Sequence, residues 1–243
     1  MRSAGESAAT RPSRFLGRTL GTGRELRRRL LLHHVPLAAI SALGLALYVI
    51  FSPSHDGISL SRFVVGTAYL GLVLLGVTLL VGPVNLLLRR RNPVSSYLRR
   101  DVGVWTALVS IVHVILGFGV LLSHTGSSLV HLLGLFVKNG KPVMDRIGLG
   151  NWTGLAATLI VVGLLVLSTD RSLSELKARR WKTLQRLNYV LFVFVVVHAV
   201  FYGSLAHGNT PSAVVLVSTV VAVLLGQAAG ILLWRRRHLS APA

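Results

Sequence analysis

Two histidines lie deep within apolar segments of this 243-residue chain. His113 ends the stretch RRDVGVWTALVSIVH, and His198 ends the stretch RWKTLQRLNYVLFVFVVVH. An imidazole that is removed from water needs another partner for its ring nitrogens. A hydroxyl or carbonyl group of a neighbouring helix satisfies most single buried histidines. Two such residues together also indicate metal ligation, because a neutral imidazole nitrogen binds metal ions well.

Counting residues places both histidines at the same depth. Thirteen residues separate Arg100 from His113, and twelve separate Arg186 from His198. At a rise of about 1.5 Å per residue, each imidazole lies roughly 18–20 Å beyond the basic boundary, just past the middle of a hydrocarbon layer about 30 Å thick. Two level imidazoles on parallel helices are suited to hold a flat macrocycle between them. We therefore predict that both ligate one haem iron.

The residues one helical turn from these histidines fit a slot for a bulky ring. Gly117 follows His113 by one turn, with Gly119 close by, and small residues let a ring approach the backbone. Phe194 and Tyr202 lie one turn on either side of His198, where they are expected to line the slot.

Long uncharged stretches must position these residues. The chain is 52% hydrophobic, and six stretches approach the roughly 20 residues that cross a bilayer as a helix. These are 33–51, 63–88, 102–123, 152–168, 187–206 and 213–234. Such continuous runs exclude the alternating pattern of a membrane β-barrel. The sequence predicts an all-α integral membrane protein with a six-helix bundle at 33–234, a basic, disordered arm at 1–32 and a short tail at 235–243.

The charge distribution predicts the orientation of the bundle. The formal net charge is +19, and the connecting segments alternate between many and few Lys and Arg residues, with 22 on one side and four on the other. By the positive-inside rule, both termini lie in the cytoplasm, with the bundle in the cell membrane. This basic face suits anionic lipid headgroups, so we expect a lipid bilayer and no nucleic acid as partner.

Several function classes are disfavoured by residues that the chain lacks. It has no cysteine, which excludes disulfides and cysteine-ligated iron–sulfur clusters. No acidic residue is expected to be buried in the six spans, because Asp101 and Asp170 sit at helix ends. Ion-coupled transporters usually keep carboxylates or broken helices near the midplane. The chain also has no Gly-rich phosphate loop, so a nicotinamide-binding module must be a separate chain.

The loops contain weaker signals. Residues 124–151 predict a short interfacial helix followed by a Gly/Pro turn. His124, His131 and His207 lie in outer loops, where they are either solvent-exposed or ligands of a loop metal. His55 and His238 carry no signal.

At this point the sequence resembles a known family. The stretches at 99–113, 151–170 and 180–198 resemble the ferric reductase-like transmembrane domain superfamily, and within it the haem-binding membrane subunit of the bacterial methionine sulfoxide reductase system. The resemblance covers about residues 35–230. It implies six helices, a b-type haem held by His113 and His198, and electron transfer across the membrane. It also implies a separate flavin- or molybdenum-containing reductase as partner.

The sequence departs from the family at two inner positions. Gln185 replaces a histidine that the family carries thirteen residues before the deep one, and Arg99 occupies the equivalent inner position before His113. Neither is an ordinary haem ligand, so one haem is expected. His33 and His34 are either lipid headgroup contacts or a substitute inner site.

The basic residues near this inner boundary allow two interpretations. Gln185 either hydrogen-bonds a haem propionate or a flavin such as FMN, or is only a polar residue at a helix start. Arg100, Arg180 and Arg186 either bind anionic cofactor groups or set topology and contact lipid. The resulting prediction is a haem b electron-transfer subunit rather than a stand-alone enzyme. The alternatives are a haemless scaffold or assembly subunit and, less favoured, a transporter.

Overall fold

The computed structural model describes residues 27–28, 30–51, 59–88, 94–125, 129–169, 172, 175–176, 178–205 and 211–239. Most of the arm expected at 1–32 therefore lies outside the described residues, as do His55, His207 and Asp170. A short π-helix, η1 (Leu30–His34), precedes the first long helix. The C-terminal helix continues as far as Leu239, into the segment expected as a tail.

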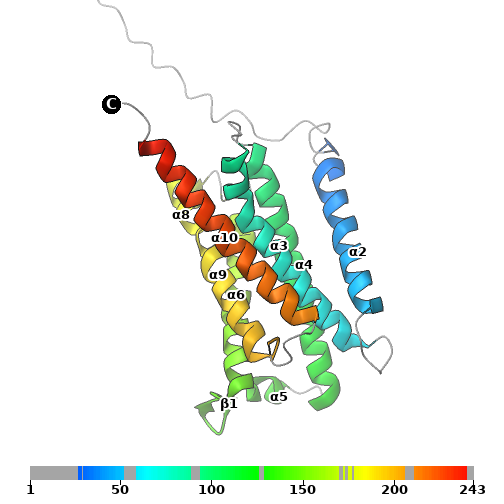
Figure 1. Cartoon of the computed structure of the whole chain (residues 1–243). Helices are drawn as coiled ribbons and strands as arrows, with labels where there is room; N and C mark the ends of the chain where they lie inside the picture. The colour runs from blue at the N-terminus through cyan, green and yellow to red at the C-terminus, as the bar shows by residue number, and fades with distance from the viewer. Residues whose placement is uncertain are drawn as a thin grey trace, which may run out of the picture.

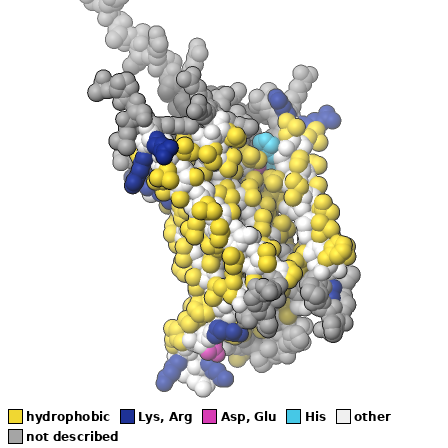
Figure 2. Space-filling view, in the orientation of Figure 1, with side chains coloured by type: hydrophobic (Ala, Val, Ile, Leu, Met, Phe, Trp, Pro, Cys, Tyr) yellow, Lys and Arg dark blue, Asp and Glu magenta, His cyan; other side chains and the backbone are white. Residues whose placement is uncertain are grey.

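Among the described residues, five helical segments are long and apolar enough to cross a membrane. They lie in η1 continued by α2 (Val35–Phe51), and in α3 (Leu60–Leu87), α4 (Val94–Thr125), α6 (Arg146–Leu167) and α10 (Pro211–Leu239). Apolar side chains remain exposed along them, and Figure 2 shows these side chains between two ends that carry Lys and Arg. Exposed apolar surface of this extent suits lipid rather than water. The predicted all-α membrane protein is confirmed.

The sixth expected span is shorter than predicted. α9 (Leu187–Phe201) has 15 residues, about 22 Å of helix, and follows the short helix α8 (Ala178–Leu184) after a turn. Its C-terminal end has a clear cause, because Gly203 adopts φ 83° and the amides of Gly203 and Ser204 donate hydrogen bonds to the carbonyls of Val200 and Ala199. This is a Schellman cap, which ends the helix before the expected residue 206.

The helices form two packed groups that meet along a shared core. α3 packs against α4, α10 and α2, while α6 packs against α9. Figure 1 shows α2 at one edge of the bundle and α10 crossing the others obliquely. Leu75, Leu79, Leu191 and Leu216 are almost fully buried where the groups meet. Because α4 and α9 belong to different groups, residues on them meet only at this junction.

The connection before α6 is built from short elements at one end of the bundle (Figure 1). The helix α5 (Leu129–Gly134) confirms the predicted short helix, and the strands β1 (Val137–Lys138) and β2 (Lys141–Pro142) follow as a hairpin. Asn139 and Gly140 form its turn with positive φ values of 51° and 72°. Asp145 then caps α6 by accepting a 2.7 Å hydrogen bond from the Gly148 amide.

Candidate functional site

The structure brings the two deep histidines together. His113 on α4 and His198 on α9 have ring centres 6.3 Å apart, with ring planes at 84° to each other. Both side chains are partly buried at the junction of the two helix groups. Their equal depth was read from residue counts alone, and the short distance between the rings agrees with it.

Each of these imidazoles is anchored by a backbone carbonyl through its Nδ1 atom. His113 Nδ1 lies 2.9 Å from the Val64 carbonyl oxygen on α3, and His198 Nδ1 lies 2.8 Å from the Gly150 carbonyl oxygen on α6. A carbonyl only accepts hydrogen bonds, so Nδ1–H is the donor in both residues. In a neutral imidazole, Nε2 then keeps its lone pair. A backbone hydrogen bond of this kind also orients metal-binding histidines and makes them better ligands.

The close approach of α6 to His198 depends on a glycine. A Cβ atom added at Gly154 would lie 2.7 Å from His198 Nδ1 and 2.8 Å from its Cε1 atom. Glycine inside a helix costs about 1 kcal/mol relative to alanine. Here that cost has a steric reason, because any larger residue would displace the imidazole.

Tyr202 packs against the His198 ring. The two ring centres are 4.8 Å apart with a tilt of 42°, as the one-turn spacing suggested. The Tyr202 hydroxyl donates to Asn151 Oδ1, and Asn151 Nδ2 donates to the Leu135 carbonyl at 3.2 Å. Phe194 instead packs against the hydrophobic core. The connection before α6 is thereby tied to the histidine pair through Asn151 and Tyr202.

The glycine next to His113 lies in more open surroundings. A Cβ atom added at Gly117 would meet no atom within 4 Å among the described residues. At Gly119 it would only touch the Leu60 side chain at 3.5 Å. The backbone beside His113 is therefore open, whereas the backbone beside His198 is closely packed. This difference leaves room for a flat group on the His113 side.

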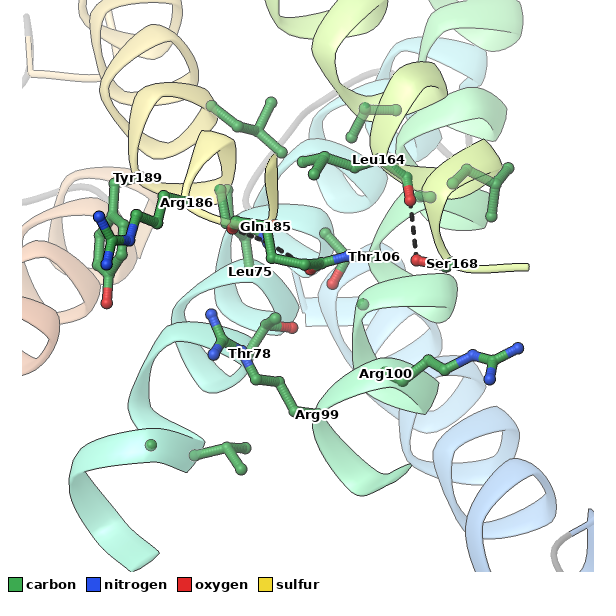
Figure 3. Close-up of a pocket in the computed structure, with 18 of the residues that line it drawn as sticks. Leu75, Thr78, Arg99, Arg100, Thr106, Leu164, Ser168, Gln185, Arg186 and Tyr189 are labelled. Carbon is green, nitrogen blue, oxygen red and sulfur yellow. Dashed lines mark hydrogen bonds between the residues drawn. The ribbon is translucent and has the colours of Figure 1, made fainter. Parts of the chain in front are cut away.

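The two inner positions that depart from the family line a separate cavity of about 430 Å³ between α3, α4, α6, α8 and α9. Figure 3 shows Arg99 and Gln185 extending into it. Arg100 and Arg186 also line it, whereas Arg180 is exposed on α8 and lies outside the lining. The structure therefore brings four of the sequence-predicted inner residues together.

One expectation about buried charge is wrong. Asp101 is expected at a helix end and not among buried residues, but its side chain is fully buried. His33 Nδ1 lies 2.7 Å from Asp101 Oδ2, and His34 Nε2 lies 3.7 Å from Oδ1. Trp105 Nε1–H donates to His34 Nδ1 at 3.2 Å. Hence these two histidines hold η1 to α4 and are not simple headgroup contacts.

This buried contact gives a stability prediction. Asp101→Asn is expected to lower the free energy of unfolding by about 1–3 kcal/mol, because the neutral amide offers one acceptor oxygen where the carboxylate offers two to His33 and His34. Thermal unfolding of the detergent-solubilised chain measures the effect. Glu175→Gln, which changes an exposed carboxylate, is the control. Equal melting temperatures for both variants would contradict the role of Asp101.

The fold and the paired histidines define a class of helical membrane proteins, and the sequence comparison names the family. Residues 66–196 match the ferric reductase like transmembrane component family. The chain belongs to this family, which agrees with the resemblance found in its sequence. The matched segment contains His113 and ends two residues before His198. A search of curated proteins finds no match. Membership of this family suggests a role in membrane electron transfer.

Some residues of the site were missed in the sequence although a signal was present. Gly150 and Gly154 are four residues apart in GNWTG, the small-xxx-small spacing that lets membrane helices approach closely. That spacing predicts close packing on the Gly side of α6. It does not reveal that His198 is the group packed there, nor that Val64 supplies a carbonyl to His113.

Proposed function

We propose that the chain is a b-type haem subunit that carries single electrons in the cell membrane for a partner reductase. The observation that supports this most is the close pair of His113 and His198, whose ring centres lie 6.3 Å apart and whose Nδ1 atoms are both held by carbonyls. Metal–imidazole bonds are about 2 Å long, so two imidazoles on opposite sides of one metal have ring centres about 6 Å apart. The measured 6.3 Å fits this requirement.

A bound haem would supply an iron that gains and loses one electron. The chain's own residues bind and orient it. His113 and His198 would donate their Nε2 lone pairs, and the Val64 and Gly150 carbonyls would fix the ring orientations. The two imidazoles and the apolar surrounding would influence the redox potential of the bound iron. The bilayer insulates the electron path, so acid–base catalytic residues are not expected.

We further propose one haem per chain. The inner positions hold Arg99 and Gln185, which do not ligate haem iron, and His33 and His34 are engaged by Asp101 instead of forming a second site. Electrons on the cytoplasmic side then need another carrier. A flavin such as FMN, or a separate flavin- or molybdenum-containing reductase subunit, would provide it.

The proposed topology has six spans with both termini in the cytoplasm. α9 alone is short for a bilayer, but α8 precedes it after a two-residue turn at Gln185 and Arg186. Together they are long enough to complete a sixth crossing. In Figure 1, α8 and the C-terminus lie at the same end of the bundle, opposite α5 and β1. The excess of Lys and Arg at the former end favours a cytoplasmic location for it.

Dithionite reduction of the purified protein tests this function. A sharp b-type α band is expected from the wild-type chain. Absence of the band after expression with adequate haem would contradict the proposal and favour a haemless scaffold. Substrate flux in haem-free liposomes would instead favour a transporter.

The single-haem proposal predicts that a substitution at Gln185 changes the haem content little. Gln185→Ala is expected to leave the haem-to-protein ratio close to that of the wild type, because Gln185 lines the inner cavity and not the histidine pair. The pyridine haemochrome assay on purified protein measures this ratio. Heavy haem loss in this variant would show that the ligands have been misassigned.

A further inference from the structure

The cavity lined by Arg99 and Gln185 is separate from the histidine pair. Its lining contains neither His113 nor His198, and Ala107, the lining residue on α4 nearest to His113 in the chain, lies six residues before it, about 9 Å along the helix axis. A volume of about 430 Å³ is within the range of small-molecule sites. Leu75, Val161, Leu164 and Leu191 form apolar walls. The cavity thus combines apolar walls with a few polar groups.

Arg99 brings a permanent positive charge into this space. Figure 3 shows its side chain reaching toward Thr78, another lining residue. The Arg99 Nε atom is buried and has no hydrogen-bond partner among the described residues. None of the described lining residues is acidic, and Asp101 faces His33 and His34. A guanidinium stays charged at any physiological pH, and its buried Nε–H requires an anion or another acceptor.

Gln185 contributes a second donor to the cavity, which Figure 3 shows beside Thr106, whereas the Arg99 guanidinium lies beside Thr78. Its Oε1 atom accepts a hydrogen bond from Asn188 Nδ2 at 3.2 Å, which leaves the Nε2 donors for another group. Thr78 and Thr106 donate their hydroxyl hydrogens to the Leu74 and Val102 carbonyls, each at 2.9 Å. These hydroxyls are therefore not donors toward the cavity. A group with several acceptor oxygens and a negative charge matches Arg99 and Gln185 together.

We propose that this cavity binds the phosphate group of an amphiphilic molecule. Arg99 would pair with the phosphate oxygens, Gln185 would donate to them, and the apolar remainder would lie along the leucine and valine walls. Phosphate of this kind comes from two sources at the basic face: an anionic phospholipid headgroup or a soluble phosphate ester that carries a ring system. Basic cavities between membrane helices commonly bind anionic headgroups. The proposal does not depend on haem binding.

Two pairs of probes distinguish the sources. The full chain is reconstituted in nanodiscs of phosphatidylcholine with or without phosphatidylglycerol, and native mass spectrometry then measures retained lipid. FMN and riboflavin, which differ by one phosphate, are titrated with flavin fluorescence as the readout. Retention of phosphatidylglycerol over phosphatidylcholine supports the lipid source, and binding of FMN over riboflavin supports the soluble ester. Failure of both preferences in the wild-type chain would overturn the proposal, whether or not any variant folds.

Variants locate the site. Arg99→Gln is expected to weaken the phosphate-dependent binding by about tenfold or more, because a charge-assisted hydrogen bond is lost. Arg235→Gln removes one charge from an exposed position on α10 and is expected to leave binding unchanged. Equal weakening by both would overturn the proposal, since it would show only a general charge effect. The haem content of Arg99→Gln is expected to match the wild type, and haem loss would assign Arg99 to the haem site instead.

Discussion

Replacing His198 with alanine is expected to lower haem retention more than about tenfold, and His113→Ala is expected to do the same. Loss of even a hydrogen-bond partner of a metal ligand typically costs 10–100-fold in affinity, and loss of the ligand itself costs at least as much. One remaining imidazole holds the iron from only one side. The haem-to-protein ratio after purification, measured by the pyridine haemochrome assay, reports this loss directly.

A histidine on the same chain that is held by other contacts serves as the control. His34→Ala removes a side chain that pairs with Asp101 and Trp105, and it is expected to reduce stability more than haem content. Comparable haem loss in all three variants would indicate general unfolding. Haem retained by both His113→Ala and His198→Ala would contradict the assigned ligands.

Gly154→Ala is expected to cause the second large loss, although it adds only one methyl group. The new Cβ atom would lie 2.7 Å from His198 Nδ1, so the imidazole must move and its 2.8 Å hydrogen bond to the Gly150 carbonyl must break. A ligand that loses its orienting hydrogen bond binds metal about 10–100-fold more weakly. The expected results are a lower haem-to-protein ratio and a shifted α band in the dithionite-reduced spectrum.

The matched control lies on the same helix. At Gly163 an added Cβ meets no atom within 4 Å among the described residues. Gly163→Ala is therefore expected to keep its haem and to gain up to about 1 kcal/mol of helix stability. If Gly154→Ala retains haem as well as Gly163→Ala does, the close approach of α6 to His198 has no role in haem binding.

The sequence predicted the features that the bilayer itself dictates, namely helix length and the depth of residues along a helix. Lipid demands long apolar helices, so counting residues predicted six spans, of which five are confirmed, and it placed His113 and His198 at equal depth, which agrees with their proximity. The end of α9 was placed too late, because an apolar run does not show where Gly203 adopts a left-handed conformation and caps the helix. Local backbone geometry of this kind ends helices within stretches that remain apolar.

Contacts between distant helices were the part that the sequence did not reveal. Asp101 looked like a boundary residue because arginines precede it, yet the fold packs it against His33 and His34 from the first helix. Likewise, nothing near residue 113 in the chain indicates that the Val64 carbonyl would bind His113. Such partners depend on how helices pack, which residue periodicity on one helix does not specify.

The haem stoichiometry of the purified wild-type chain, read together with its dithionite-reduced spectrum, tests the central claim most directly. One b-type haem per chain is predicted, held between the imidazoles of α4 and α9. Either no haem at all or two haems per chain would contradict this account.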